Sequence, residues 1–241
     1  MRPFFARIGN KYPIRNEIIK RIPEHTIYVE PFVGSGAILF SKEPSQIEII
    51  NDLDKTVFEN FNMLKEANPD ISAYTLHSGK ENIQKFVDCD HESKENQLLK
   101  RMYMSANTFS STGRGKIFKP DSGKQKIKRI KPCKERLTNV QIFNTDFKEI
   151  IEQYDSEETF FFLDPPYENS KQDLYKHHIF DYVEFLNILK KIKGKFLLTM
   201  NDSENIQDIF KEFNIDRIIV IGNYLKTIGS KDRKELIITN Y

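Results

Sequence analysis

The most chemically specific segment of the chain is FFFLDPPY, residues 160–167. Its apolar run predicts a buried central strand, and the two prolines end that strand abruptly. Because prolines fix the main chain, the carboxylate of Asp164 and the carbonyl of Pro165 can both accept hydrogen bonds from one amino group. A strand end with an incidental acid and ring would not explain the order Asp164, Pro165, Pro166, Tyr167. Two acceptors beside the stacking face of Tyr167 suit the exocyclic amine of a nucleobase.

A loop with two glycines, Gly34 and Gly36, follows the first predicted strand and leads into a predicted helix near Ala37. Glycine lets a ligand approach the backbone closely at the carboxyl edge of an α/β sheet, where such folds bind ligands. The loop lacks the third glycine of the dinucleotide fingerprint and the Gly-Lys-Ser/Thr of a phosphate loop, so neither NAD nor ATP is favoured. Taken alone, the pair of glycines is also consistent with a packing turn.

Acidic residues follow the next two predicted strands. Asp52 lies 16 residues beyond Gly36, and an acid at this strand end accepts hydrogen bonds from ribose hydroxyls in nucleoside-binding α/β folds. Asp52 could equally cap the helix that is predicted to start near Lys55. Asp146 and Phe147 repeat the pattern at the third strand end, where an acid can accept from an adenine amino group while the ring stacks on the purine.

The charge of the chain is concentrated in residues 100–136, which we call the basic segment. It holds twelve Lys and Arg against two acids, a net charge of +10, whereas the whole chain has a net charge of only +2. Such asymmetry points to a polyanion, although a charge run is more often a solvated loop. The aromatics Tyr103, Phe109 and Phe118 are interleaved with the charges, which suits a hairpin or loop laid on phosphates with stacking partners.

Two kinds of nucleic-acid contact are expected from the basic segment. Asn107 and Arg114 can read adenine and guanine, respectively, through paired hydrogen bonds. The remaining candidates are cations that would contact phosphates: Lys116, Lys119, Lys126, Lys128 and Arg129.

The elements that must position these residues alternate between apolar β-rich runs and amphipathic helical stretches, which predicts a doubly wound, mostly parallel α/β fold. Strands are predicted at 27–31, 47–51, 140–144, 159–163, 195–200, 215–221 and 235–240. Helices are predicted at 13–21, 36–42, 55–67, 146–153, 181–192 and 203–213. Residues 70–138 interrupt the alternation and are predicted to form an insertion with its own helices at 81–88 and 93–104.

Length and composition limit the class of protein. A chain of 241 residues with 39% hydrophobic and 30% charged residues is typical of one globular domain. Its two isolated cysteines, Cys89 and Cys133, give neither a disulfide framework nor a zinc set and fit a reducing compartment. No apolar run is long enough for a membrane span or a signal peptide, so we expect a cytoplasmic protein.

Taken together, these motifs resemble the α-group DNA adenine N6-methyltransferases of the Dam type, over nearly the whole chain. The resemblance covers Gly9-Asn10-Lys11, the loop from Glu30 to Gly36, the acids described above, residues 164–167, and the C-terminal segment KELIITNY, residues 234–241. The order of the glycine loop, an insertion and then the Asp-Pro-Pro-Tyr motif is that of the α group. Arg7 stands where the family often has an aromatic residue, with Phe5 nearby, and Gly9-Asn10-Lys11 stands for its Gly-Gly-Lys.

The resemblance implies a Rossmann-like methyltransferase sheet that transfers a methyl group from S-adenosyl-L-methionine (AdoMet) to an adenine flipped out of double-stranded DNA. It places AdoMet-binding and catalytic functions in residues 1–69 and 139–241, and target recognition in 70–138. The implied cofactor-binding residues are Arg7, Lys11, Phe32, Gly34, Gly36, Asp52, Asp146, Phe147 and Asp164. The implied base contacts are Asp164, Pro165 and Tyr167.

No metal is required by this chemistry, and we expect a monomer or weak dimer without membrane association. Two alternatives stay open on the sequence. One is an amino methyltransferase acting on cytosine N4 or on RNA, because the motif does not separate these targets. The other is a catalytically silent DNA-binding protein on the same scaffold, against which the intact motif argues.

Overall fold

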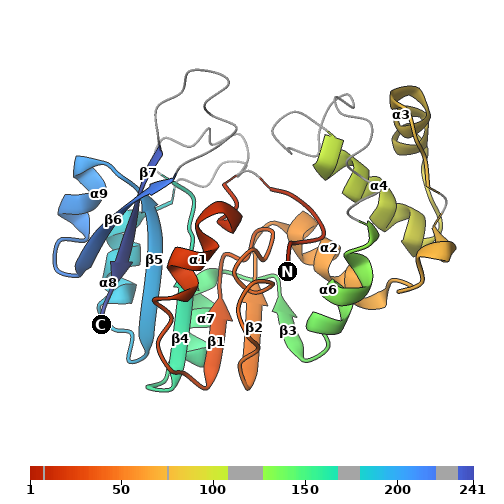
Figure 1. The fold of residues 1–241 in the computed structure, drawn as a ribbon. Coiled ribbons are helices and arrows are strands. Elements are labelled where there is room, and N and C mark those ends of the chain that lie inside the picture. Colours follow the sequence, from red (N-terminus) through yellow and green to blue (C-terminus); the bar gives the residue numbers. More distant parts are fainter. Residues whose placement is uncertain (8, 75, 108–126, 168–179, 221–232) are drawn as a thin grey trace. The chain divides into compact units, whose positions relative to one another are not determined.

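The computed structural model describes residues 1–7, 9–74, 76–107, 127–167, 180–220 and 233–241 (Figure 1). The chain divides into two compact units. Unit 1 comprises Met1–Tyr12, Gly34–Pro44 and Lys55–Ile142, and unit 2 comprises Pro13–Val33, Ser45–Asp54 and Phe143–Tyr241. The described part of the expected insertion, 70–138, thus belongs to a unit that also contains the N-terminus and the second half of the glycine loop.

Seven strands form one sheet, and all of them begin and end within two residues of their predicted positions. They are β1 (Ile27–Glu30), β2 (Ile47–Asn51), β3 (Val140–Phe143), β4 (Thr159–Leu163), β5 (Lys195–Asn201), β6 (Asn214–Val220) and β7 (Arg233–Thr239). Their order is β3-β2-β1-β4-β5-β7-β6. The pairs β1–β2, β1–β4 and β4–β5 are parallel, and β7 is antiparallel to both β5 and β6. The mostly parallel doubly wound sheet expected from the sequence is confirmed.

The strand order reverses between β1 and β4, and this point decides where the site lies. In open α/β sheets, ligands bind outside the carboxyl ends of the strands at such a switch point. β1 leads into Pro31 and Phe32, and β4 leads directly into Asp164. Every residue of β4 is buried, as expected for a central strand that is covered on both faces.

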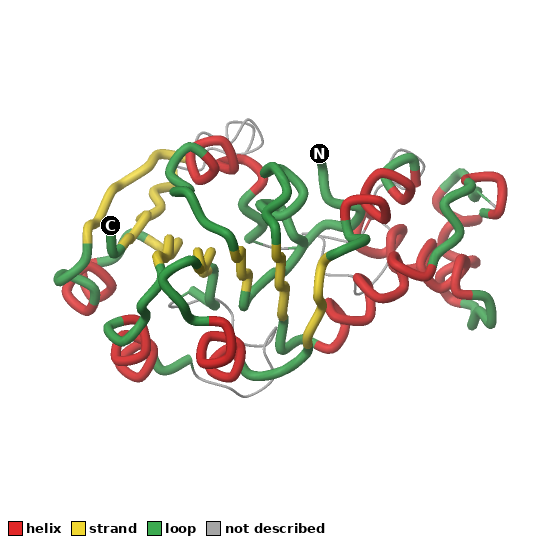
Figure 2. Tube along the Cα trace, turned by 90° about the horizontal axis from the view of Figure 1, so that it is seen from below, coloured by secondary structure: helices red, strands yellow, loops and turns green. Residues whose placement is uncertain are grey.

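Among the described residues, four helices belong to unit 2: α1 (Arg15–Ile19), α7 (Phe147–Tyr154), α8 (Tyr182–Leu189) and α9 (Glu204–Ile209). Figure 2 shows α7, α8 and α9 on one side of the sheet and α1 on the other. Phe185 and Leu189 of α8 and Ile206 of α9 share a buried core with Phe161 of β4 and Phe196 of β5. The helices α7, α8 and α9 are each capped by a side chain that accepts a hydrogen bond from a main-chain N–H. The capping residues are Asp146, Asp181 and Ser203, respectively.

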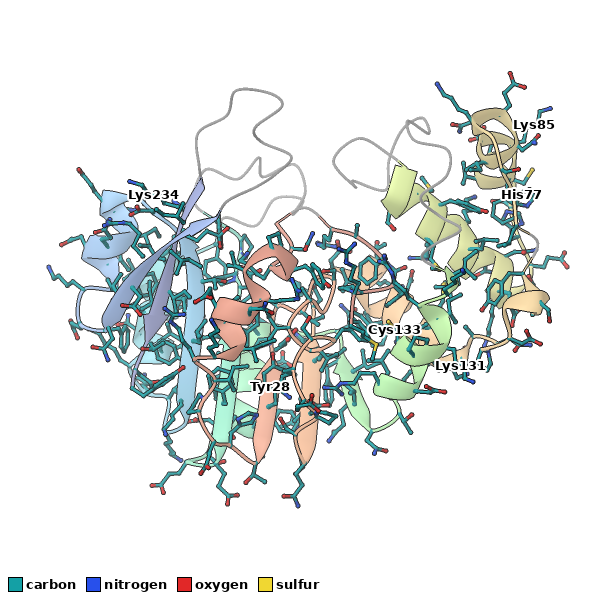
Figure 3. The ribbon with its side chains drawn as sticks, in the orientation of Figure 1. Tyr28, His77, Lys85, Lys131, Cys133 and Lys234 are labelled. Carbon is teal, nitrogen blue, oxygen red and sulfur yellow. The ribbon has the colours of Figure 1, made fainter. Side chains whose placement is uncertain are left out.

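The helices described in unit 1 are α2 (Lys55–Glu66), α3 (Lys80–Asp88), α4 (Lys94–Asn107) and α6 (Ile130–Arg136). Short 3-10 turns are present at Tyr12–Ile14 (η1) and Ile71–Ala73 (η2). Arg101 joins α4 to α2 through a 2.6 Å ion pair with Glu59 and a 3.1 Å hydrogen bond to Asn60. Cys133 of α6 is buried (Figure 3), and burial raises the pKa of its thiol to about 12.

The predicted helix at 36–42 is wrong. This stretch forms successive turns, with only isolated bonds such as Phe40 N to Gly36 O at 2.9 Å. The stretch begins at Gly36, whose φ of 70° lies outside the helical region, and Pro44 follows soon after it. Because Ala37 to Phe40 are all buried, the segment also lacks the polar face of an amphipathic helix.

The helices predicted within the insertion at 81–88 and 93–104 are confirmed as α3 and α4. The hairpin or loop expected of the basic segment is not found where α4 and α6 form part of it. Its first part, to Asn107, is the end of α4, and Ile130–Arg136 forms α6. Tyr103 is fully buried, and its hydroxyl donates to the carbonyl of His77 at 3.0 Å and accepts from the His77 N–H at 2.9 Å. Tyr103 is therefore a core residue of unit 1 and not a stacking partner for bases. Phe109 and Phe118 lie outside the described residues.

Candidate active site

The carboxylate after β4 is held from the neighbouring strand. Asp164 is half-buried, and its Oδ1 accepts a 2.9 Å hydrogen bond from the hydroxyl of Thr199, which is fully buried in β5. β4 and β5 are paired in parallel up to Leu163 and Leu198, so the residues after these two positions lie beside each other. The carboxylate is thereby fixed at the switch point of the sheet.

The tyrosine of the same motif is also held, through its hydroxyl. Tyr167 Oη donates to Oε2 of Glu235 in β7 at 2.9 Å. Burial raises the pKa of Tyr167 well above its ordinary value, and the nearby carboxylates of Asp164 and Glu235 raise it further. The phenol is therefore neutral at physiological pH and remains a hydrogen-bond donor.

The proline pair between these two side chains is anchored as well. Pro165 is buried and Pro166 is half-buried. The hydroxyl of Tyr182, the first residue of α8, donates to the carbonyl of Pro166 at 2.7 Å. The motif is thus tied to β5, to β7 and to α8, and its geometry is set before any ligand arrives.

A buried asparagine links the strand ends that carry the predicted cofactor residues. Asn51, the last residue of β2, is 1% exposed. Its Nδ2 donates to the carbonyls of Pro31 and Thr145, both at 3.0 Å, and its Oδ1 accepts from the Thr145 N–H at 2.9 Å. Its own carbonyl accepts from the N–H of Val33 at 2.9 Å. One residue therefore ties together the segments that follow β1, β2 and β3.

The two predicted acids lie on these segments, and both form local hydrogen bonds. Asp52 Oδ1 accepts from the Asp54 N–H at 2.9 Å, which closes the turn that leads into α2. Asp146 Oδ1 accepts from the Lys148 N–H at 2.9 Å and caps α7. A carboxylate has two oxygens and about four acceptor positions, so neither bond excludes a role toward a ligand.

Three aromatic rings pack together near the ends of β1 and β3. The centroids of Phe32, after β1, and Phe147, at the start of α7, are 5.1 Å apart with their planes tilted by 36°. Phe180 is 5.9 Å from Phe32 and 5.6 Å from Phe147. All three rings are half-buried, so each has a partly exposed surface at the carboxyl end of the sheet.

The other predicted cofactor residues belong to unit 1. Lys11 is buried, and its ammonium donates to the carbonyl of Gly9 at 2.9 Å. Gly34 and Gly36 have φ values of 51° and 70°, which favour glycine. A Cβ on Gly36 would lie 3.1 Å from the rings of Phe40 and Phe61, so packing also restricts this position. Beside the other glycine, Arg7 is half-buried, and its Cδ would be 3.8 Å from a Cβ on Gly34.

Few of the predicted DNA-binding residues can be described. Arg114, Lys116, Lys119 and Lys126 lie outside the described residues, and Asn107 is described only as the last residue of α4. Lys128 is exposed. The guanidinium of Arg129 donates to the carbonyl of Pro3 at 3.0 Å, so this cation already has a contact within unit 1.

Comparison with known proteins places these features in a family. Residues 8–221 match the family described as D12 class N6 adenine-specific DNA methyltransferase. The chain belongs to this family. As a D12 class enzyme it methylates N6 of adenine in DNA with AdoMet as the methyl donor. This decides against the cytosine N4 and RNA alternatives.

Two relatives that this D12 class enzyme matches over nearly their full length are type II methyltransferases by name. It is 26% identical to type II methyltransferase M1.LlaDCHI of Lactococcus lactis subsp. cremoris, covering 100% of this chain and 96% of the relative. It is 25% identical to type II methyltransferase M.MjaIII of Methanocaldococcus jannaschii, covering 100% and 99%. DNA adenine methylase of Escherichia coli K12 is 31% identical over 64 residues, 27% of this chain and 23% of the relative.

Solved structures are more distant. Precorrin 8W decarboxylase from Methanobacterium thermoautotrophicum has a TM-score of 0.46 and 11% identity over 100% of this chain and 99% of the other. An rRNA methylase from Streptococcus thermophilus has a TM-score of 0.41 and 10% identity over 98% of each chain. Scores this low add nothing to the identification.

The residues of unit 2 fit the cofactor of the D12 class. Carboxylates follow β2, β3 and β4, and the paired rings of Phe32 and Phe147 follow β1 and β3. Carboxylates accept from ribose hydroxyls and from an adenine amine, and aromatic faces stack on a purine. Among the described residues no helix is long and apolar enough to cross a membrane, and no group of three or more His, Cys, Asp or Glu could hold a metal ion.

Sequence reasoning missed three residues that hold the site together: Asn51, Thr199 and Glu235. Asn51 directly precedes Asp52, a predicted cofactor-binding residue, and Glu235 lies in the C-terminal segment that resembles the family's last strand. A polar residue within an otherwise apolar strand could have indicated each of them, because a buried polar group needs a hydrogen-bond partner. The sequence does not say which partners those are.

Proposed function

We propose that this D12 class methyltransferase binds a flipped adenine of double-stranded DNA with N6 at Asp164 and Pro165 and the ring against Tyr167. The observation that carries the proposal is the fixed position of two functional side chains. The carboxylate of Asp164 is held by Thr199, and the ring of Tyr167 is held by Glu235, at the end of a fully buried strand. Flipping costs a few kcal/mol, which stacking and polar contacts in the pocket repay.

The chemical problem at N6 explains why two acceptors are needed. The lone pair of the amine is delocalised into the purine ring, so the nitrogen is a poor nucleophile until it becomes pyramidal. Asp164 and the carbonyl of Pro165 accept the two N6 hydrogens and favour the pyramidal form. The carboxylate also stabilises the positive charge that develops on N6 during transfer. AdoMet, when bound, supplies an electrophilic methyl group on a sulfonium.

Cofactor-binding roles follow from the strand ends in unit 2. We assign Asp52 to the ribose hydroxyls, Asp146 to the adenine amine, and Phe32 and Phe147 to the purine face. Their positions are supported by the hydrogen bonds of Asn51, which join the three segments that carry them. The roles of Arg7, Lys11, Gly34 and Gly36 in unit 1 rest on the family resemblance, as does the shared role of Asp164.

Target recognition is assigned to residues 70–138, with the basic segment as the part that contacts DNA. Exposed Lys128 suits a phosphate contact. Asn107, Arg114, Lys116, Lys119, Lys126 and Arg129 complete the proposed set. We also propose a cytoplasmic monomer or weak dimer, and a role in a type II restriction-modification system, which the names of the full-length relatives support.

Methylation of DNA with labelled AdoMet, followed by mapping at base resolution, tests the proposal. We expect N6-methyladenine at one sequence context with wild-type enzyme and no product with Asp164→Ala. The matched control is Asp155→Ala, which removes a carboxylate that accepts from the N–H groups of Lys193 and Gly194 next to the start of β5. Activity of Asp164→Ala within a fewfold of wild type would reject Asp164 as the acceptor for the amine.

A further inference from the structure

The partner of Tyr167 is an unusual residue for the inside of a sheet. Glu235 is 4% exposed and lies in β7, where its neighbours Leu236, Ile237 and Ile238 are all buried and apolar. Burying a carboxylate is costly unless it is well hydrogen-bonded. A carboxylate at this position therefore needs a physical reason, and its contact with Tyr167 provides one.

The register of the sheet brings Glu235 to the edge where the motif lies. Glu235 is paired with Asn201, the last residue of β5, and paired residues of antiparallel strands project to the same face. Thr199, two residues before Asn201, projects to that face as well and binds Asp164. Thr199 and Glu235 thus hold neighbouring members of one motif from two adjacent strands.

We propose that Glu235 is a positioning residue for adenine methylation, which fixes the ring of Tyr167 through its hydroxyl before the flipped base arrives. The inference rests on the proposed stacking role of Tyr167. The main chain of the motif is fixed by its prolines and by the hydrogen bond from Tyr182 to Pro166. The ring still has two side-chain torsions. The 2.9 Å bond to Glu235 fixes the position of Oη and so restrains χ1, and the preference of the phenol hydrogen for the ring plane couples the bond to χ2. A ring whose hydroxyl end is already held loses less conformational entropy when the base stacks on it.

The chemistry of the bond indicates which substitutions test it. The raised pKa of Tyr167 keeps its hydroxyl protonated, so the hydroxyl donates and Glu235 accepts. A glutamine at position 235 can accept the same hydrogen through its amide oxygen, whereas alanine cannot. Tyr167→Phe removes the bond from the other side without changing the buried carboxylate. These variants distinguish loss of the bond from loss of the charge.

The experiment is a double-mutant cycle of Tyr167→Phe and Glu235→Ala, measured as single-turnover methylation of duplex DNA. We expect each single variant to lower the rate by about ten- to a hundredfold, the range for one lost hydrogen bond to a charged group. The double variant should be no slower than the slower single variant, and Glu235→Gln should stay within a fewfold of wild type. AdoMet affinity should be unchanged throughout.

A spectroscopic measurement reports the ring itself. With 2-aminopurine at the target position, a stacked tyrosine quenches the emission of the flipped base. We expect brighter emission from the complex of Glu235→Ala, which keeps the phenol but lacks the bond, than from wild type and Glu235→Gln. The control Glu48→Ala removes another buried strand carboxylate, 5% exposed in β2, which accepts from the Ser45 N–H at 3.1 Å. It should lower stability without changing the emission.

The outcomes separate this inference from the proposed function. Wild-type activity of Tyr167→Ala would reject the stacking role of Tyr167 and the inference with it. An inactive Tyr167→Ala beside a fully active Tyr167→Phe would reject only the positioning role. Additive effects in the cycle, or loss of activity in Glu235→Gln, would also overturn it, because Glu235 would then act by another route. If Glu235→Ala does not fold, Tyr167→Phe tests the same bond with the carboxylate intact.

Discussion

Replacing Asn51 by alanine tests whether one buried amide holds the proposed cofactor segments in place. The substitution removes the two hydrogen bonds that Nδ2 donates to Pro31 and Thr145 and the one that Oδ1 accepts from Thr145. The bond from the Val33 N–H to the carbonyl of residue 51 is a main-chain contact and remains. The variant therefore loosens the segments after β1 and β3 but leaves the end of β2 in register.

The expected magnitude follows from the groups that lose their partner. Two carbonyls and one N–H are affected, and each buried polar group without a partner costs about 1 to 3 kcal/mol. Because water can reach part of this network, we take the lower end and expect a loss of about 3 kcal/mol in the free energy of unfolding. For a chain of this length that lowers Tm by about 6 to 12 °C. AdoMet binding should weaken by at least about tenfold, or 1.4 kcal/mol.

The assay combines thermal unfolding with calorimetric titration of AdoMet. The matched control is Asn240→Ala, which removes a 2.9 Å bond to Gly194 O and a 2.8 Å bond from the Phe196 N–H near the start of β5. We expect the control to lower Tm and to bind AdoMet with wild-type affinity. Asn51→Ala should lower both. If Asn51→Ala binds AdoMet as tightly as Asn240→Ala does, the amide stabilises the fold only and does not position the cofactor segments.

Further predictions concern four single side chains. Asp52→Ala should weaken AdoMet binding by about 1 to 3 kcal/mol if it accepts from ribose, and unchanged affinity by calorimetry would leave Asp52 with its turn-closing role alone. Thr199→Val removes the hydroxyl that holds Asp164 and should lower kcat by about tenfold. Thr199→Ser keeps a hydroxyl and should restore kcat, so equal rates for the two variants would refute a role for this hydrogen bond. Lys128→Ala should weaken DNA binding equally for all sequences and reduce the salt slope by about one. Arg114→Ala should instead relax discrimination at one base position by about 1 to 3 kcal/mol. If the variant methylates all sequences of a randomised DNA library more slowly by the same factor, Arg114 contacts only the phosphate backbone.

Much of the fold could be predicted because the signals for it are local. The apolar run of residues 160–163 predicts a buried strand whatever surrounds it, and all seven strands are where their runs of residues place them. The Asp-Pro-Pro-Tyr motif restricts its own backbone, so its place at a strand end follows from sequence. The predicted helix at 36–42 is wrong for a local reason too, because Gly36 with its positive φ and the nearby Pro44 outweigh a short apolar pattern.

Contacts between distant parts of the chain were decided only by the tertiary structure. Thr199 is 35 residues from Asp164, and Glu235 is 68 residues from Tyr167. Tyr103 lies in a helix that the sequence predicts, but only the folded unit shows that this ring is buried and cannot stack on DNA. The sequence by itself determined the strands, the reactive motif and the family. Which buried polar groups hold that motif depended on strand order and register, because a hydrogen bond needs its partner within about 3 Å and only the folded sheet brings the two together.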